Sequence, residues 1–596
     1  MDKSKTSFRT CMCAEITKED LGKKVTLSGW VQRRRDLGGV IFIHLRDRSG
    51  IMQLVANSEL NKEVFETAEN VRNEYVLKVS GEVVLRDEEN FNPNIKTGEL
   101  ELKLDTMEVL DSANTPPIYI DESDNANEAT RLEYRFLDLR KDKIKNNLIT
   151  RAKTCSVVRN FLDSEGFLEI ETPFLGKPTP EGARDFLVPS RIRKGKFFGL
   201  PQSPQLFKQI LMVSGMDRYY QIVKCFRDED LRQDRQPEFT QIDLEMSFVD
   251  VDDVIDVNER LVKKVFKEII DYDIETPIMR MEFSEAMDRF GSDKPDTRFG
   301  MELFDLSDIL KDCKFNVFAG PIKNGGSVRA INAKGLANFF SRRDIDALVD
   351  YVKTYGAKGL AWIAVNEDGS IKSQITKFLS EEETKGILDR AKAENGDIVF
   401  IVADKNKVVY DSLGNLRLHI AKKAEIKMDE GFNFLWVTNF PMFEYDENEK
   451  RYKAMHHPFT APMDEDLDKL ESEPGEVRAK AYDLVVNGVE MGGGSIRIHS
   501  GEVQQKVFNV LGFSDEEAEN KFGFLLKALK YGTPPHGGLA FGLDRMIMLL
   551  VDTENIRDVI AFPKTQNHTC LMSDAPSIVS EEQLEELGIE VTDEEE

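Results

Sequence analysis

Three segments far apart in the chain each place an arginine beside glycines or acidic residues. The first begins at Phe226-Arg227-Asp228-Glu229, the second runs from Asp483 to Arg497, and the third from Gly537 to Arg545. The planar guanidinium, with five N–H donors, suits carboxylate and phosphate groups. Each segment alone has an ordinary explanation, such as a surface ion-pair cluster or a tight turn. Their joint occurrence favours a fold in which all three converge on one cationic cleft.

Composition places the chain among ordinary globular proteins. Its 596 residues suggest about four folded units, with 31% charged and 41% hydrophobic residues. The net charge is −27, so a polyanionic partner would need a local concentration of positive charge. Six cysteines are too few for disulfide bonds to stabilise a chain of this length. A structural zinc site near Cys11 and Cys13 is a minor alternative. Without a signal peptide or an apolar run of about 18 residues, we expect a cytoplasmic protein that does not enter a membrane.

Residues 1–112 have the pattern of a small oligonucleotide-binding (OB) barrel. Short runs in which hydrophobic and polar residues alternate include residues 25–31 and 40–46. A helical stretch, 61–72, precedes the last two runs. Five strands with a helix between the third and the fourth are typical of this barrel. Between Lys23 and Arg48, seven residues are basic and two are acidic. The positive charge that a polyanion requires is therefore concentrated here.

Breaker residues and composition divide the rest of the chain. We expect a linker rich in proline and small polar residues, a catalytic domain in two parts, an α+β insertion without a chemical motif, and an acidic tail. The last sixteen residues hold nine acids and no bases, which predicts a solvated, partly disordered end. The boundaries are 113–135 for the linker, 136–290 and 425–575 for the two catalytic parts, 291–424 for the insertion and 576–596 for the tail.

The motifs resemble those of class II aminoacyl-tRNA synthetases, and of the bacterial-type aspartyl-tRNA synthetases among them. The run 161–173 is similar to motif one, the helix–strand dimer element that ends in proline. The runs 226–229 and 538–545 resemble motifs two and three. The resemblance extends to about residue 575. It implies a multidomain α+β fold, with an anticodon-binding OB barrel, a catalytic domain built on an antiparallel sheet with helices, and an inserted α+β (GAD-like) domain.

The resemblance implies ATP-dependent activation of L-aspartate, release of pyrophosphate, and transfer of aspartate to the 3′ terminal adenosine of tRNA(Asp). The substrate's own carboxylate attacks the α-phosphorus, so catalysis rests on positioning and charge stabilisation. This agrees with the lack of a recognisable nucleophilic triad in the sequence. The resemblance assigns catalysis to Arg227, Glu229 and Arg545. It assigns ATP binding to Arg227, Asp228, Glu229, Gln236, Glu490, Gly542, Leu543, Asp544 and Arg545.

Aspartate differs from asparagine by one charge, so a buried cation is needed to select it. Leaving such a charge unpaired costs about 3–5 kcal/mol, or about two to three and a half decades of discrimination. By resemblance, the aspartate site consists of Glu181, Gln205, Lys208, Arg227, Asp243, His456 and Arg497. An exposed helical lysine is the alternative for Lys208. Whether His456 or His457 matters more stays open.

The resemblance also implies Mg²⁺ and a tRNA contact. Asp483 and Glu490 resemble the family's Mg²⁺ carboxylates, although Asp483 could also be a surface acid on a helix. The implied anticodon contacts are Arg33, Arg34, Arg35, Leu37, Phe42 and Gln53. Phe42 would stack on a base, unless it belongs to the barrel core. Leu37 resembles the form of this loop in synthetases restricted to tRNA(Asp), where relatives that also charge tRNA(Asn) often have histidine.

We therefore expect a homodimeric aspartate–tRNA ligase. The nearest alternative is an asparaginyl or non-discriminating relative that also aspartylates tRNA(Asn). A catalytically silent paralogue predicts loss of Arg227, Glu490 or Arg545, and all three are present. A small-molecule ligase without tRNA binding predicts loss of the barrel, and the barrel pattern is present.

Overall fold

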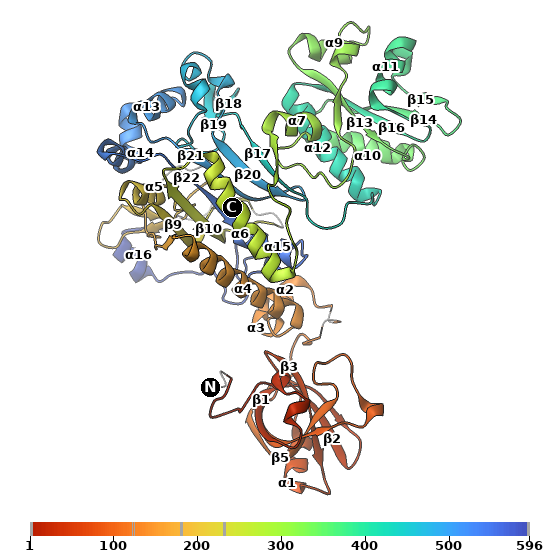
Figure 1. Ribbon diagram of the computed structural model, residues 1–596, viewed down its shortest axis with the longest axis vertical. Coiled ribbons are helices and arrows are strands. Elements are labelled where there is room, and N and C mark those ends of the chain that lie inside the picture. The colour runs from red at the N-terminus through yellow and green to blue at the C-terminus, as the bar shows by residue number, and fades with distance from the viewer. Residues whose placement is uncertain (1–3, 122, 124, 179–182, 231–233, 593–596) are drawn as a thin grey trace. The chain divides into compact units, whose positions relative to one another are not determined.

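The fold was analysed in a computed structural model (Figure 1), which describes residues 4–121, 123, 125–178, 183–230 and 234–592. The chain forms two compact units. The first comprises Met1–Asn146 and Cys570–Ala575, and the second comprises Asn147–Thr569 and Pro576–Glu596. Within the described ranges, no helix is both long and apolar enough to cross a membrane.

The first unit contains a closed five-stranded barrel, as the sequence predicts. The strands follow the order β1-β2-β3-β5-β4, and α1 (Lys62–Asn70) lies between the third and the fourth in sequence. Alternate residues fill the interior, with Leu27, Val31, Ile41 and Ile43 fully buried. The strands are β1 (Lys24–Asp36), β2 (Val40–Asp47), β3 (Gly50–Asn57), β4 (Val76–Leu85) and β5 (Leu100–Asp111).

The predicted linker and tail contain more regular structure than we expected. Two short helices, α2 (Glu128–Glu133) and α3 (Arg135–Asp138), form at the end of the linker, where Asn127 caps α2 through its side chain. The acidic tail contains α16 (Glu581–Leu587). Ser580 and Gln583 form a capping box there, and Glu581 and Glu582 lie favourably in the first turn. Residues Glu581–Leu587 of the predicted solvated tail are therefore helical, and most of them are exposed.

The second unit is built on an eight-stranded sheet of order β11-β17-β20-β21-β22-β10-β9-β6. The central pairs are antiparallel, and the edge pairs β11/β17 and β6/β9 are parallel. Helices α4 (Asp142–Ser164), α6 (Val251–Ile270) and α15 (Leu543–Leu550) share one hydrophobic core with this sheet and cover one of its faces (Figure 1). The strands are β6 (Leu168–Glu169), β9 (Arg218–Phe226), β10 (Glu238–Ser247), β11 (Met279–Glu282), β17 (Phe434–Thr438), β20 (Ala481–Val486), β21 (Val489–Arg497) and β22 (His536–Gly542).

The insertion has its own antiparallel sheet of order β12-β13-β16-β14-β15, with hydrophobic clusters on both faces. It follows α7 (Phe283–Phe290) and ends with α12 (Asn406–Lys423), a helix that the sequence reading missed. The other elements are β12 (Leu303–Asp305), α8 (Ser307–Leu310), α9 (Asn316–Lys323), β13 (Ser327–Ala333), α10 (Arg342–Lys353), β14 (Ala361–Val365), β15 (Ile371–Ser373), α11 (Glu381–Ala391) and β16 (Ile398–Asp404).

Smaller elements complete the second unit around the large sheet. Two short hairpins and three helices accompany it: β7 (Leu187–Pro189), β8 (Phe197–Gly199), α5 (Gln205–Val213), β18 (Phe443–Asp446), β19 (Arg451–Ala454), α13 (Gly501–Val510) and α14 (Asp515–Ala528). Helix α5 contacts β9 and β10, so its buried residues face the sheet.

Candidate active site

Strand alternation separates the hydrophobic core from a polar face of the sheet. On β10, Ile242 and Leu244 belong to the core shared with the helices, so Asp243 and Glu245 point to the opposite face. Asp483 of β20 has the same relation to its core neighbour Leu484. The period of two therefore places several carboxylates on one side of the sheet.

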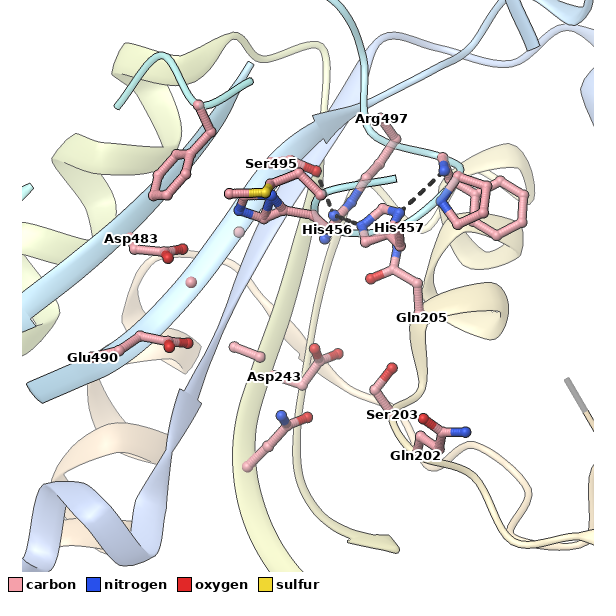
Figure 2. A pocket seen from close by; sticks show the side chains of 18 of the residues that line it. Gln202, Ser203, Gln205, Asp243, His456, His457, Asp483, Glu490, Ser495 and Arg497 are labelled. Atoms are coloured by element: carbon pink, nitrogen blue, oxygen red, sulfur yellow. Dashed lines mark hydrogen bonds between the residues drawn. The ribbon is translucent and has the colours of Figure 1, made fainter. Parts of the chain in front are cut away.

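A cavity of about 380 Å³ lies on this polar face (Figure 2). Four of its lining residues carry buried polar atoms without a hydrogen-bond partner among the described residues: Gln205 Nε2, Arg227 Nε, Asp243 Oδ2 and His456 Nδ1. A buried polar atom without a partner costs free energy, and native structures contain few of them. Their convergence on one cavity marks a site prepared for a polar ligand.

Two cations and two carboxylates form a buried cluster in the wall of this cavity. Lys208 Nζ lies 2.6 Å from Asp243 Oδ1 and 3.2 Å from Glu245 Oε2. Arg497 Nε donates to Glu245 Oε1 at 2.9 Å. Burial raises the pKa of Asp243, whereas for Glu245 the effect of burial is outweighed by Arg497 and Lys208, which hold its pKa below the usual value. Lys208 is 2% exposed, so the exposed-lysine alternative was wrong.

Both candidate histidines line the cavity, with different partners (Figure 2). His457 Nε2 lies 2.7 Å from a terminal nitrogen of Arg497, and His457 Nδ1 accepts from the backbone N–H of Phe459. His456 packs edge-on against Phe440, with ring centroids 4.8 Å apart. Burial lowers the pKa of His456 to about 4, so its imidazole is neutral at pH 7.

A second cavity, of about 220 Å³, adjoins the first. Arg227, Lys294 and Glu490 line both cavities. The Arg227 guanidinium lies over the ring of Phe239 at 5.1 Å. Arg545 donates to the backbone carbonyl of Glu490 at 2.6 Å. Two arginines from segments 318 positions apart in sequence therefore line one cavity.

Not all of the residues that the resemblance assigns to ATP binding line the second cavity. Glu229, Gln236, Glu490, Gly542, Asp544 and Arg545 line the second cavity with Arg227, whereas Asp228 and Leu543 are not among its lining residues. Leu543 is buried in the hydrophobic core.

The polar groups of Gln236 and Asp544 already have protein partners. The Gln236 amide exchanges two hydrogen bonds with the backbone of Lys564. The Asp544 carboxylate accepts from Arg151 and from the backbone N–H of Thr240. Gln236 and Asp544 therefore stabilise the walls of the second cavity.

Asp483 and Glu490 lie together on the side of the first cavity formed by β20 and β21 (Figure 2). Gly493 makes room for them, because a β-carbon there would lie 2.3 Å from Asp483 Oδ1 and 3.6 Å from Glu490 Oε1. Burial and the nearby Glu490 raise the pKa of Asp483. Burial also acts on Glu490, but Lys294 outweighs it and lowers the pKa of Glu490. Asp483 belongs to a strand and is 9% exposed, so the alternative of a surface acid on a helix was wrong.

The barrel carries a separate groove of about 610 Å³. Arg33, Arg35, Leu37, Phe42 and Gln53 line it, together with His44, Arg86 and Glu101. Phe42 is half-buried between the core residues Ile41 and Ile43, so its ring lies on the outer face of β2. Gln53 donates to Glu101 at 2.9 Å.

The arginine run of the barrel does not act as one surface. Arg34 binds the backbone carbonyl of Ala68 and the carboxylate of Asp36, and it is not among the lining residues of the groove. Strand alternation explains this separation, because neighbouring residues point to opposite faces.

The sequence reading missed Glu245, Ser495 and Lys294, whereas it left open whether His456 or His457 matters more. Glu245 follows Asp243 by two positions, so strand alternation could have indicated it. Ser495, which accepts from Arg497 at 2.6 Å, stands two positions from that arginine. Lys294 belongs to a segment that indicated only a break in regular structure. Glu181, assigned to the aspartate site, lies outside the described residues.

The chain matches the family model of class II tRNA synthetases (D, K and N) over residues 127–566, and that of the OB-fold nucleic acid binding domain over residues 25–110. It belongs to the class II tRNA synthetases. The predicted fold class and family are therefore confirmed.

Among named members of this synthetase family, the chain is 60% identical over 586 residues to an aspartate–tRNA ligase of Ruminiclostridium cellulolyticum, covering 98% of both chains. It is 59% identical over 583 residues to an aspartate–tRNA(Asp/Asn) ligase of Caldanaerobacter subterraneus, again covering 98% of both. An asparaginyl-tRNA synthetase of Pyrococcus horikoshii has a similar fold, with a TM-score of 0.58 and 19% identity over 93% of this chain and 98% of that one.

Proposed function

We propose that this class II tRNA synthetase is an aspartate–tRNA ligase. It activates L-aspartate with ATP to aspartyl-adenylate and pyrophosphate, and then transfers aspartate to the 3′ terminal adenosine of tRNA(Asp). The observation that carries the amino-acid site is the convergence of four unpaired, buried polar atoms on one cavity beside a second cavity that contains Arg545. Relatives about 60% identical over 98% of their length carry the name of this activity.

The first cavity would hold aspartate. Asp243 Oδ2 accepts a hydrogen bond from the substrate ammonium, and Gln205 Nε2 donates one to the substrate. Lys208 and Arg497 provide positive charge for the side-chain carboxylate. Arg227, which lines both cavities, binds the α-carboxylate and the α-phosphate, so the nucleophile and the phosphorus meet beside one cation.

The second cavity would hold ATP. Arg545 binds the γ-phosphate, and Glu229, which lines the same cavity, binds the nucleotide. Gly542 lines this cavity as the N-cap of α15, and the first turn of that helix adds backbone N–H groups near the phosphates. The reaction needs no protein nucleophile, because the aspartate carboxylate forms the bond to the α-phosphorus while pyrophosphate leaves.

Asp483 and Glu490 are suited to Mg²⁺. They offer hard oxygen ligands, and the missing side chain of Gly493 leaves room beside both. Among the described residues, no group of three or more His, Cys, Asp or Glu side chains forms a metal site, so triphosphate oxygens and water would complete the coordination. Bound Mg²⁺ would neutralise phosphate charge and stabilise the leaving pyrophosphate.

The barrel groove would bind the anticodon of tRNA(Asp). Arg33 and Arg35 meet the phosphate backbone, and the ring of Phe42 stacks on a base, with about 1–3 kcal/mol expected from such stacking. Gln53 reads a base edge. Arg34 acts indirectly, because its guanidinium is bound to Ala68 and Asp36. Leu37 is 73% exposed at the groove, where it can meet the tRNA.

The enzyme would act as a homodimer in the cytoplasm. Strand β6 forms an edge of the large sheet, and Leu168, Phe174 and Leu175 are 50%, 44% and 54% exposed there. Large apolar side chains beside an unpaired sheet edge favour pairing with another chain. Leu168 belongs to the segment 161–173 that resembles motif one, and Phe174 and Leu175 follow this segment directly.

The second candidate function is charging of both tRNA(Asp) and tRNA(Asn). A relative 59% identical carries the name aspartate–tRNA(Asp/Asn) ligase. The leucine at position 37 favours restriction to tRNA(Asp).

The purified chain should exchange pyrophosphate into ATP with aspartate and not with asparagine, and should aspartylate tRNA(Asp). Charging of purified tRNA(Asn) would establish the second candidate. Arg227→Ala should abolish the exchange. Normal exchange by this variant would contradict the role of Arg227, and exchange with asparagine alone would contradict the proposed function.

A further inference from the structure

Lys294 belongs to the loop that joins α7 to β12, outside the segments that carry the family motifs. Its Nζ lies 2.9 Å from Glu490 Oε2 and 3.8 Å from Asp293 Oδ2. The side chain is 43% exposed, so it borders solvent and can change partner. Lys294 lines both the aspartate cavity and the ATP cavity. A lysine from the insertion segment therefore reaches the junction where the two substrates would react.

The loop that carries Lys294 is anchored on its C-terminal side by one buried arginine. Arg417 of α12 is 1% exposed and donates hydrogen bonds to the carbonyls of Asp296, Phe299, Gly300 and Met301. Its guanidinium also lies 4.3 Å from the centroid of the Phe299 ring. All of these contacts are with carbonyl groups or a ring of the loop, so the position of Arg417 depends on the path of the loop.

The N-terminal side of the loop packs against the same helix. A β-carbon on Gly291 would lie 2.5 Å from the carbonyl oxygen of Tyr410, and one on Gly414 would lie 2.5 Å from the carbonyl oxygen of Gly291. Only glycines permit this approach of the two backbones. Both sides of the loop are thus fixed by α12 of the insertion, with Lys294 between them.

The charges around Lys294 indicate a change of partner during the reaction. Asp483 and Glu490 form a carboxylate pair suited to a divalent cation, and Lys294 is the ammonium that pairs with Glu490 in the structure. An ammonium and a divalent cation compete for the same carboxylate oxygens. A phosphate group at the junction of the cavities offers the displaced ammonium a new anionic partner.

We propose that Lys294 is a nucleotide-binding residue that the insertion holds in the active site. Its ammonium pairs with Glu490 in the free enzyme, leaves this carboxylate when a divalent cation binds, and donates to a phosphoryl oxygen of ATP. This inference rests on the proposed function, from which it takes the ATP and metal sites. It gives the inserted domain a role in catalysis, because α12 positions the loop.

The first test measures Mn²⁺ binding to the full-length enzyme without ATP, by electron paramagnetic resonance of free Mn²⁺. Lys294→Met should bind Mn²⁺ about two- to fivefold more tightly than the wild type, since a partly exposed ion pair no longer competes. Lys294→Arg should stay near the wild type. Lys480→Met is the matched control, because Lys480 pairs with Asp250 and Asp464 outside both cavities.

The second test measures the KM for ATP in aspartate-dependent pyrophosphate exchange. Loss of a charge-assisted hydrogen bond should raise this KM at least tenfold in Lys294→Met, with the KM for aspartate changed less than threefold. If Lys294 were only a counter-ion of Glu490, its removal would leave ATP binding unchanged or tighter. An unchanged or lower KM for ATP therefore overturns the proposal, as does unchanged Mn²⁺ affinity.

A double-mutant cycle tests the part played by the insertion. Arg417→Met should alter Mn²⁺ affinity in the wild type and have no further effect when Lys294 is already methionine. Gly414→Ala, which displaces Gly291, should give the same dependence if Arg417→Met does not fold. Independent effects would overturn the positioning role.

Failure of the proposed metal site is distinguishable from failure of this inference. Glu490→Gln should weaken Mn²⁺ binding. If Glu490→Gln binds Mn²⁺ like the wild type, the metal site of the proposed function falls, and the inference with it. If Glu490→Gln weakens binding while Lys294→Met has no effect, only the inference is overturned.

Discussion

Replacing Lys208 by methionine tests how aspartate is selected. The substitution keeps an unbranched, flexible side chain that is one atom shorter, and it removes the charge from a cluster that also contains Asp243, Glu245 and Arg497. Lys208 lines the first cavity and is not among the residues that line the second. The variant should therefore separate amino-acid binding from ATP binding.

The expected magnitude follows from one hydrogen bond to a charged group. Such a bond contributes about 1.5–3 kcal/mol, so kcat/KM for aspartate should fall about 10- to 150-fold. The KM for ATP should change less than about threefold. Removing one partner from a buried ion pair also destabilises the fold, by about 3–5 kcal/mol, because Asp243 and Glu245 lose their ammonium.

Aspartate-dependent pyrophosphate exchange, with either substrate varied, measures both constants. Circular dichroism at the assay temperature must show that the variant is folded, and Lys480→Met serves as the control for loss of a lysine ion pair. The rate of pyrophosphate exchange with aspartate should fall in this variant, and any exchange with asparagine should not. The ratio of the two rates should therefore decrease. Equal losses toward aspartate and ATP would refute the assignment of Lys208 to the side-chain carboxylate.

Other positions give independent tests. Phe42→Ala should lower kcat/KM for tRNA charging about 5- to 150-fold, the equivalent of 1–3 kcal/mol of stacking, and leave pyrophosphate exchange intact; unaffected charging would mean that no base stacks on the ring. Gly493→Ala should reduce pyrophosphate exchange more than tenfold, because the new β-carbon would lie 2.3 Å from Asp483 Oδ1. Gly501→Ala is the control, since a β-carbon there would have no neighbouring atom within 4 Å. Equal activities of the two variants would contradict a role of Asp483 and Glu490 in the reaction. His456 has a pKa of about 4 in the folded chain against an ordinary 6.5, so between these values only the unfolded chain takes up the proton and stability falls as the pH falls. Urea unfolding should show that acidification from pH 7 to 5 costs the wild type about 2 kcal/mol more than His456→Gln, and equal losses would show that His456 does not titrate in this way.

Local patterns were sufficient to predict the barrel. The alternating runs 25–31 and 40–46 lie in strands β1 and β2, and the predicted helical stretch 61–72 contains α1. These elements depend on period-two alternation and glycine turns, which are local properties. Helix α12 was missed, although it fixes the loop around Lys294.

The site was predictable where a motif carried it and unpredictable where tertiary contacts made it. Arg227 and Arg545 were expected together, and they line one cavity. The path of the loop that brings Lys294 to Glu490 depends on Arg417, more than 100 positions away in sequence. The separation of Arg34 from Arg33 and Arg35 needed only strand alternation, which the sequence reading did not apply there.

The charges assigned to the amino-acid site explain why a neutral analogue would be rejected. In the cavity wall, the cations Lys208 and Arg497 are paired with the carboxylates Asp243 and Glu245, while burial keeps His456 neutral. In the proposed binding mode, the side-chain carboxylate of aspartate is a further anionic partner for Lys208 and Arg497. Asparagine offers a neutral amide at this place and leaves the two buried cations with one anionic partner fewer, which is the costly arrangement inside a protein. Selection on this view depends on the net charge of the whole cluster, so Glu245→Gln, which removes one negative charge beside Lys208 and Arg497, should strengthen the preference for the anionic side chain and raise the Asp/Asn ratio in pyrophosphate exchange. An unchanged ratio would show that direct contact with Lys208, and not the charge balance, decides between the two amino acids.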